Sequence, residues 1–194
     1  MDKRISTRTL TIGAALTAIV LILQLMGAFI RLGPFSMSFV LVPIVVGAAT
    51  CGTAVGTWLG LVFGVAVLIS GDAAPFLAVD IFGAVVTVLV KGALCGLVAG
   101  LIYNALKKIN KTFAAVCAAI VCPITNTGVF LAGCSVFFMD TLKIWGQGEG
   151  FGDNVLLYMI VGLVGINFVI ELGINIVLSP AISTLLNVFV KEKK

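Results

Sequence analysis

The chain is 194 residues long, 61% of its residues are hydrophobic, and only 10% are charged. Its mean hydropathy is +1.25, and its apolar fraction is well above the roughly one half that is typical of a soluble domain. Because one helical crossing of a bilayer takes about 20 residues, this length is filled by about six or seven spans, without room for a soluble catalytic domain. The sequence has no histidine and no CxxC pair among its five cysteines, which argues against zinc, haem and thiol-redox centres. We therefore expect an integral membrane protein without a cofactor.

Long apolar segments predict the membrane-spanning helices. The charge-free stretch 32–71 is too long for one span, and Pro34, Pro43 and the glycines of 47–52 divide it in two. We expect an all-α bundle of six transmembrane helices, forming a single domain over residues 1–194. The six predicted helices cover about residues 9–30, 35–48, 51–70, 76–106, 112–139 and 154–190.

The basic residues predict the orientation of this bundle. A cytoplasmic N-terminus places nine of the twelve inside, namely Lys3, Arg4, Arg8, Lys107, Lys108, Lys111, Lys191, Lys193 and Lys194. We therefore expect both termini to be cytoplasmic and the chain to lie in the cell (plasma) membrane. A cleavable signal peptide is the competing interpretation of the first 30 residues, but no A-x-A-like site follows the apolar run. The basic residues are scattered between apolar runs, so no nucleic acid partner is expected despite the net charge of +4.

Lys91 lies near the middle of the fourth predicted helix, where a charge costs about 2.5–3.5 kcal/mol and needs compensation. Asp80, Thr87 and Lys91 are separated by steps of 7 and 4 residues, which places them within about 40° on one helix face. These three residues predict a polar stripe that runs inward from the outer end of the helix.

The last two predicted helices add further polar groups. Asn167, Glu171, Asn175 and Ser179 follow one another in i+4 steps, and Asn126 is the strongest polar group of the Thr125–Thr127 segment. Lys91 and Glu171 either form an ion pair that locks two helices together or contribute to a solute site. We favour the solute site, because a cation, a carboxylate and several amides converge on one interior.

Two outer segments are long enough to fold over such a site, the alternative being that they are plain connectors. Residues 70–79 contain Asp72, and residues 139–153 contain Trp145. Small residues recur elsewhere at helical spacing: Gly52, Gly56, Gly60 and Gly64, then Gly92, Gly96 and Gly100, predict seams of close helix packing. Ala14 and Ala18 form a similar pair on the first helix and predict a docking face.

Four segments resemble a known family in their order and spacing: TLTIGAALTAIVLIL, VLVKGALCGLVAGLIYNALKK, ITNTGVFL and NFVIELGINIVLSPAI. They are similar to the substrate-binding S components of energy-coupling factor transporters. The resemblance implies a six-helix subunit that binds a vitamin or related micronutrient from outside and performs no chemistry on it. It also implies a transmembrane coupling subunit, which would contact Ala14 and Ala18, and two ATPase subunits as partners. Lys91 departs from the family, whose members often have arginine near this position.

The resemblance gives roles to the polar residues but does not identify the solute. Lys91 would be a counter-charge, Glu171 an acceptor, and Asn126 and Asn167 hydrogen-bonding groups. Pantothenate, folate and riboflavin all remain open, and Lys91 favours a solute with a carboxylate. The rival classes are a stand-alone facilitator or channel and a small integral-membrane lipid enzyme. The first would transport without partners, and the second would need an acid–base pair near the interface.

Overall fold

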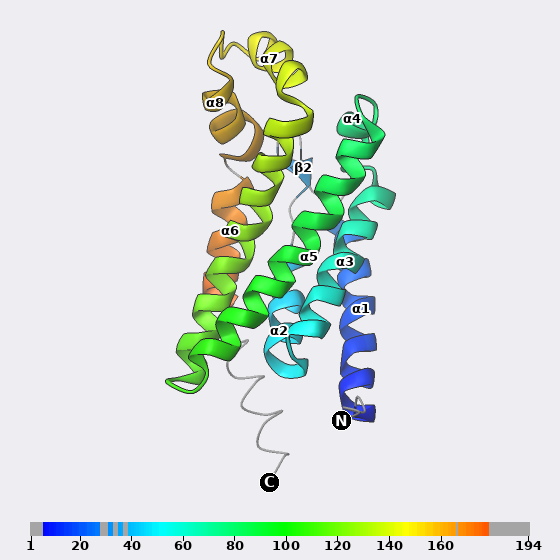
Figure 1. The fold of residues 1–194 in the computed structure, drawn as a ribbon, viewed down its shortest axis with the longest axis vertical. Coiled ribbons are helices and arrows are strands. Elements are labelled where there is room, and N and C mark those ends of the chain that lie inside the picture. The colour runs from blue at the N-terminus through cyan, green and yellow to red at the C-terminus, as the bar shows by residue number, and fades with distance from the viewer. Residues whose placement is uncertain (1–5, 28–30, 33–34, 37–38, 166, 179–194) are drawn as a thin grey trace.

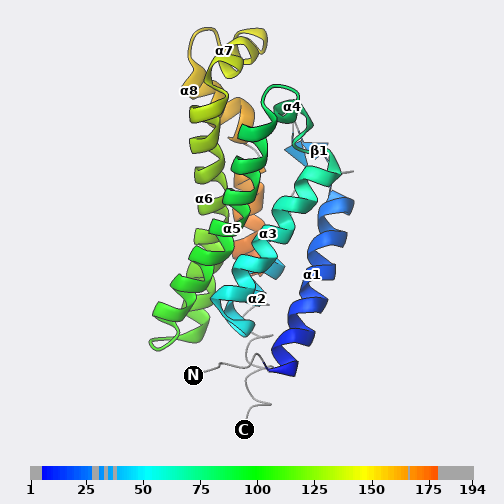
Figure 2. The same cartoon turned by 45° about the vertical axis from the view of Figure 1, so that its right-hand side comes forward.

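A computed structural model describes residues 6–27, 31–32, 35–36, 39–165 and 167–178 as a bundle of helices (Figures 1 and 2). The elements in chain order are α1 (Thr7–Gly27), β1 (Arg31–Leu32), β2 (Phe35–Ser36), α2 (Leu41–Cys51), α3 (Thr53–Ser70), α4 (Ala74–Leu77), α5 (Ile81–Leu106), α6 (Lys111–Phe137), α7 (Met139–Gly148), α8 (Val155–Leu157) and the π-helix η1 (Tyr158–Gly165). A further helix, Asn167–Leu178, follows η1. Figure 1 shows α4, α7 and α8 at one end of the bundle, called here the α7 end, and the turn between α5 and α6 at the other.

Four helices are long and apolar enough to cross a membrane: α1, α3, α5 and α6. A fifth crossing arises if Val155–Gly165 and the Asn167–Leu178 helix, which are bent by 45° relative to each other, count as one span. The 11 residues of α2 extend only about 16 Å at 1.5 Å per residue, about half the hydrocarbon thickness. The all-α membrane bundle is therefore confirmed, with four or five candidate spans among the described residues. The count of six and the orientation of the termini remain predictions.

The region predicted as a helix over residues 35–48 begins differently. Phe35 and Ser36 form strand β2, which pairs antiparallel with β1 through Arg31↔Ser36 and Leu32↔Phe35. The helix starts only at Leu41, with Pro43 in its first turn, where a missing N–H is tolerated. Gly52 then separates α2 from α3 with a φ of 103°, a conformation that favours glycine.

The predicted helix over 76–106 is also divided. A short helix, α4, precedes a break, and α5 starts after Asp80, whose side chain accepts a hydrogen bond from the backbone N–H of Phe82 at 3.0 Å. Asp80 is thus the N-cap of α5, a position that aspartate favours. Because Asp80 has extended backbone dihedrals (φ −147°, ψ 107°), helical spacing does not place its side chain, and the stripe predicted for Asp80, Thr87 and Lys91 does not include it.

Glycines bring α3 and α5 into backbone contact. A Cβ atom added at Gly60 would overlap the carbonyl oxygen of Gly92, and one added at Gly96 would overlap that of Gly56. This close approach is the packing expected of small residues at four-residue spacing in a membrane. The seam of glycines therefore allows α3 and α5 to pack with their backbones in contact.

The segment 139–153, predicted as an outer loop, contains the ten-residue helix α7. The predicted helix over 154–190 is interrupted after η1, and Ser179 lies outside the described residues. The five cysteines carry free thiols; Cys95, Cys122 and Cys134 are buried, as expected of small packing residues.

Candidate solute-binding cavity

A cavity lies inside the bundle, between α3, α5, α6 and the two segments on either side of residue 166. The cavity has a volume of about 90 Å³. Its polar lining residues are Gln24, Asp72, Thr87, Lys91, Asn126, Thr127, Asn167 and Glu171. Its aromatic lining residues are Phe63, Phe76, Phe130, Phe138 and Phe168. Most of its wall is apolar, with a few polar groups at separate points, which is the usual composition of a small-molecule site.

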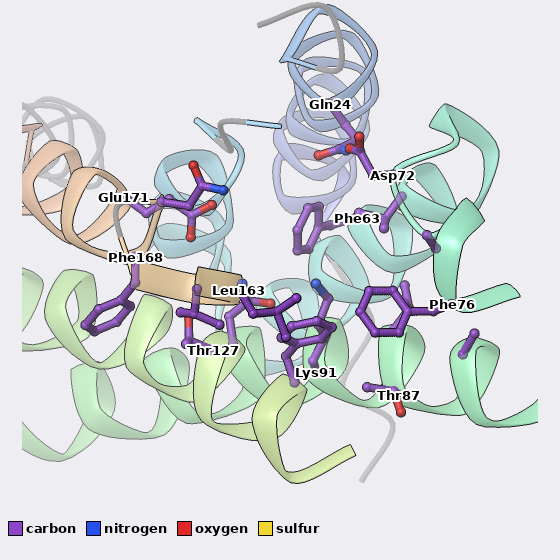
Figure 3. Close-up of a pocket in the computed structure, with 18 of the residues that line it drawn as sticks. Gln24, Phe63, Asp72, Phe76, Thr87, Lys91, Thr127, Leu163, Phe168 and Glu171 are labelled. Atoms are coloured by element: carbon purple, nitrogen blue, oxygen red, sulfur yellow. The ribbon is translucent and has the colours of Figure 1, made fainter. Parts of the chain in front are cut away.

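Lys91 projects from α5 into this cavity (Figure 3). Its Nζ lies over two aromatic rings, 5.0 Å from the centroid of Phe130 and 5.8 Å from that of Phe63. Such contacts stabilise an ammonium group through the negative face of the ring. In the part of the chain that the structure describes, Lys91 forms no ion pair within 4.0 Å, and the one ion pair present joins Lys143 to Asp140 at 3.0 Å. Lys91 and Glu171 therefore line the same cavity without being locked to each other.

A largely buried hydrogen-bond network joins α1 to the end of α3 and to the turn that follows it. The side-chain amide of Gln24 donates to Asp72 Oδ2 at 2.7 Å and to Ser70 Oγ at 3.3 Å. The hydroxyl of Ser70 has two acceptors within reach of its one proton, the same carboxylate oxygen at 3.3 Å and the carbonyl of Val67 at 3.2 Å. Asp72, predicted as part of a lid, is therefore a wall residue of the cavity. Sequence reasoning missed Gln24, although a single amide in an otherwise apolar helix is itself a signal of a polar interior.

Asn126 and Asn167 face the cavity from α6 and from the Asn167–Leu178 helix. They are only 6% and 9% exposed, and their Oδ1 atoms have no hydrogen-bond partner among the described residues. The same holds for the hydroxyl oxygen of Thr87, which is 4% exposed. Each such group costs about 1–3 kcal/mol when nothing satisfies it. A ligand, or water in its absence, would therefore stabilise the protein most by forming hydrogen bonds with these three groups.

Asn175 belongs to the predicted stripe but not to the cavity wall. It is fully buried, and its side-chain amide donates to the backbone carbonyl of Glu171 at 2.8 Å. Within this helix, the stripe thus contributes Asn167 and Glu171 to the site and uses Asn175 for internal packing.

Phe76 and Leu163 separate this cavity from a second one at the α7 end, because both residues line both. Phe76 meets Phe130, Phe138 and Trp145 edge-on, at centroid distances of 5.5, 5.1 and 5.6 Å. The second cavity, of about 440 Å³, is lined by Trp145 but not by Lys91. Trp145, predicted as a lid residue, therefore lies one aromatic layer away from the polar groups.

Two further predicted residues, Ala14 and Ala18, lie on α1 and are exposed. Leu16 and Val20, on another face of the same helix, pack into the core. The pair is therefore available on the outside of the described bundle. Within the described ranges, no group of three or more His, Cys, Asp or Glu side chains could hold a metal ion.

The comparison with known families agrees with this architecture. Residues 8–183 match the family described as the ECF transporter, substrate-specific component. No curated protein matches the chain. Members of this family are the binding subunits of a transporter and not enzymes, and their partners are a substrate and an energising module. Since the match covers most of the sequence, the chain belongs to the substrate-specific components of energy-coupling factor transporters.

Proposed function

We propose that this chain captures a small polar solute, a vitamin or related micronutrient, in the cavity lined by Lys91. A transmembrane coupling subunit and two ATPase subunits would then drive its import. The observation that carries the proposal is the gathering, in one cavity of a membrane-spanning bundle, of an ammonium group and of amides whose oxygens have no partner among the described residues. Groups of this kind are costly in hydrocarbon and are kept there for function.

In this proposal, Lys91 donates a hydrogen bond to a carbonyl or carboxylate oxygen of the solute. Asn126 and Asn167 bind its remaining polar groups, and Glu171 accepts from a donor. Asp72 is held in the wall by Gln24 at 2.7 Å and supports the end of the site near α4. Asp80 is left out of the proposed site, since it caps α5.

The same proposal gives the bundle an orientation in the membrane. Arg8 in the first turn of α1 and Lys107, Lys108 and Lys111 around the turn between α5 and α6 are exposed. Figure 1 shows the start of α1 and this turn at the end opposite α7. Positive charge favours the cytoplasmic side, so the α7 end would face outward and both termini would be cytoplasmic. A solute would then enter from the α7 end.

Phe76 is the proposed barrier on that entry path, because it separates the second cavity from the one lined by Lys91. Replacing it with alanine would remove a ring that is 4% exposed and join the two spaces. We expect Phe76→Ala to accelerate solute dissociation in stopped-flow measurements, whereas Phe82→Ala, which removes a ring that is 71% exposed, leaves it unchanged. Equal dissociation rates in both variants would contradict a barrier at Phe76.

Ala14 and Ala18 are the proposed contact with the coupling subunit. Leucine at both positions would add bulk to an exposed helix face where close approach is needed. We expect this double variant to lose co-purification with the coupling subunit while its solute affinity stays the same. Ala132→Leu is the matched control, since Ala132 is exposed on α6. Loss of solute affinity with an intact complex would contradict this assignment of α1.

The function itself is tested with purified protein in two arms. A thermal-shift screen against a vitamin panel should find a stabilising solute, because a ligand that binds only the folded state raises its stability. Liposomes containing the full complex should take up that solute only with ATP inside, and liposomes with this chain alone should not. Uptake by the chain alone would instead establish the stand-alone facilitator.

A further inference from the structure

We infer that the solute is a flat nitrogen heterocycle with a lactam edge, in which a ring N–H stands beside a carbonyl oxygen. This inference rests on the proposed function, because it takes the cavity lined by Lys91 as the solute site.

The first step comes from the two amide side chains. Asn126 and Asn167 are at least nine-tenths buried, line the same cavity, and have carbonyl oxygens without a partner in the described structure. A carboxamide offers an acceptor and donors side by side. Its best complement is a group that presents a donor and an acceptor in the same arrangement, as the edge of a lactam does. A carboxylate offers only acceptors and would leave both amide oxygens unsatisfied.

The second step comes from the aromatic wall. Phe76, Phe130 and Phe138 form a cluster with centroid distances of 5.5 and 5.1 Å from Phe76, and Phe63 faces the cavity from α3. Aromatic side chains pair best with other rings, in offset-stacked or edge-to-face geometry. A conjugated ring between these side chains gains such contacts, whereas a branched acyclic chain does not.

The third step concerns Lys91. Its Nζ lies over Phe130 at 5.0 Å, so part of the stabilisation of its charge comes from the protein itself. The ammonium group has three N–H donors, and a neutral carbonyl oxygen is a sufficient acceptor for one of them. Lys91 therefore fits a second carbonyl group on the ring as well as it fits a carboxylate.

Three probes test the inference by equilibrium binding to the full chain in nanodiscs. Quinazoline-2,4-dione has two rings, two carbonyl groups and two ring N–H donors. Its 1,3-dimethyl derivative has the same rings without the donors, and pantothenate is an acyclic carboxylate. We expect the dione to bind and methylation to weaken binding at least about 10-fold, since it leaves buried acceptors unsatisfied. Pantothenate should bind more weakly than the dione.

Variants of the protein give the reciprocal measurement. Asn126→Ala should weaken dione binding about 10-fold or more and reduce the difference between the dione and its dimethyl derivative. Asn104→Ala is the control. The side-chain amide of Asn104 donates to Thr53 Oγ1 at 2.9 Å, and Asn104 does not line the cavity, so this variant should leave the affinity for the dione unchanged. The comparison of the two probes needs only the unaltered chain, so it remains decisive if a variant does not fold.

Three results would overturn the inference: equal affinity for the dione and its dimethyl derivative, tighter binding of pantothenate, or no binding of any probe to the folded chain. Failure of the proposed function is measured separately. It would be seen as absence of ATP-dependent uptake of any vitamin by the reconstituted complex. Tight pantothenate binding together with such uptake would refute the lactam edge and leave the transport role intact.

Discussion

Replacing Lys91 with methionine distinguishes a binding lysine from a locking one by the sign and size of the stability change. Methionine has a similar length and flexibility and removes only the charge and the three donors. In the structure, Lys91 makes ring contacts at 5.0 and 5.8 Å and, among the described residues, no ion pair within 4.0 Å. The substitution therefore breaks no short charge contact with any residue that the structure describes.

The opposing energies are of similar size. Holding a lysine at the centre of a membrane helix costs about 2.5–3.5 kcal/mol. The cation–π contacts of Lys91 with the two rings offset about 2 kcal/mol of this cost when the charge is desolvated. We therefore expect Lys91→Met to change stability by no more than about 1.5 kcal/mol, in the stabilising direction. Breaking a buried ion pair would instead destabilise the protein by about 3–5 kcal/mol.

These values predict different thermal shifts. At about 2–4 °C per kcal/mol for a chain of this size, Lys91→Met should move the melting temperature of the solute-free protein upward by less than about 6 °C. The assay is the fraction of protein that remains monodisperse after heating in nanodiscs. Lys143→Met is the control, because its pair with Asp140 is exposed and worth at most about 1 kcal/mol. A fall of more than about 6 °C for Lys91→Met, with unchanged solute affinity, would refute the reasoning and favour a locking ion pair.

Two further predictions use the same heating assay, each with a matched control. Gly60→Ala should destabilise the protein by about 1–3 kcal/mol, since its Cβ would overlap the backbone of α5, whereas Gly128→Ala, with open space around it, should have little effect; equal effects would contradict the close seam. Gln24→Leu should cost about 1–3 kcal/mol by removing a buried donor from Asp72. Gln147→Leu removes a similar amide bond of 2.9 Å from the exposed surface and should cost less than about 0.5 kcal/mol. A similar loss in both glutamine variants would refute the importance of burial.

Helical periodicity predicted the polar wall of the cavity wherever the helix is continuous. Thr87 and Lys91 line it from α5, and Asn167 and Glu171 line it from the last described helix. The prediction failed at Asp80, which caps the start of α5 with extended backbone dihedrals and does not line the cavity. Periodicity assigns residues to a face, but the backbone break decides how far along the chain that face extends.

The aromatic half of the cavity was not predictable in the same way. A phenylalanine side chain can face lipid or a packed interior, so its position in an apolar helix does not show which of the two it faces. Phe82 is 71% exposed, whereas Phe76, six residues earlier, is 4% exposed and separates two cavities. Only the three-dimensional arrangement distinguishes them. An amide in an apolar helix, such as Gln24, is different, because its cost in hydrocarbon makes its position in the sequence informative by itself.

The cavity is bounded by a long, closely packed helix pair on one side and by short elements on another, and in the proposed function this difference determines where a solute would pass. Between α3 and α5, the backbones of Gly60 and Gly92 are so close that not even a Cβ atom fits between them, which leaves no path for a solute through this wall. The barrier toward the α7 end is built from shorter elements: Phe76 belongs to the four-residue helix α4, and Leu163 belongs to the π-helix η1. A helix of four residues has few internal hydrogen bonds to lose, and π-helical geometry is a rare conformation that is frequent at functional sites. If the proposed function holds, we therefore expect opening between Phe76 and Leu163 to cost less than opening along the glycine seam, so that the solute enters from the α7 end.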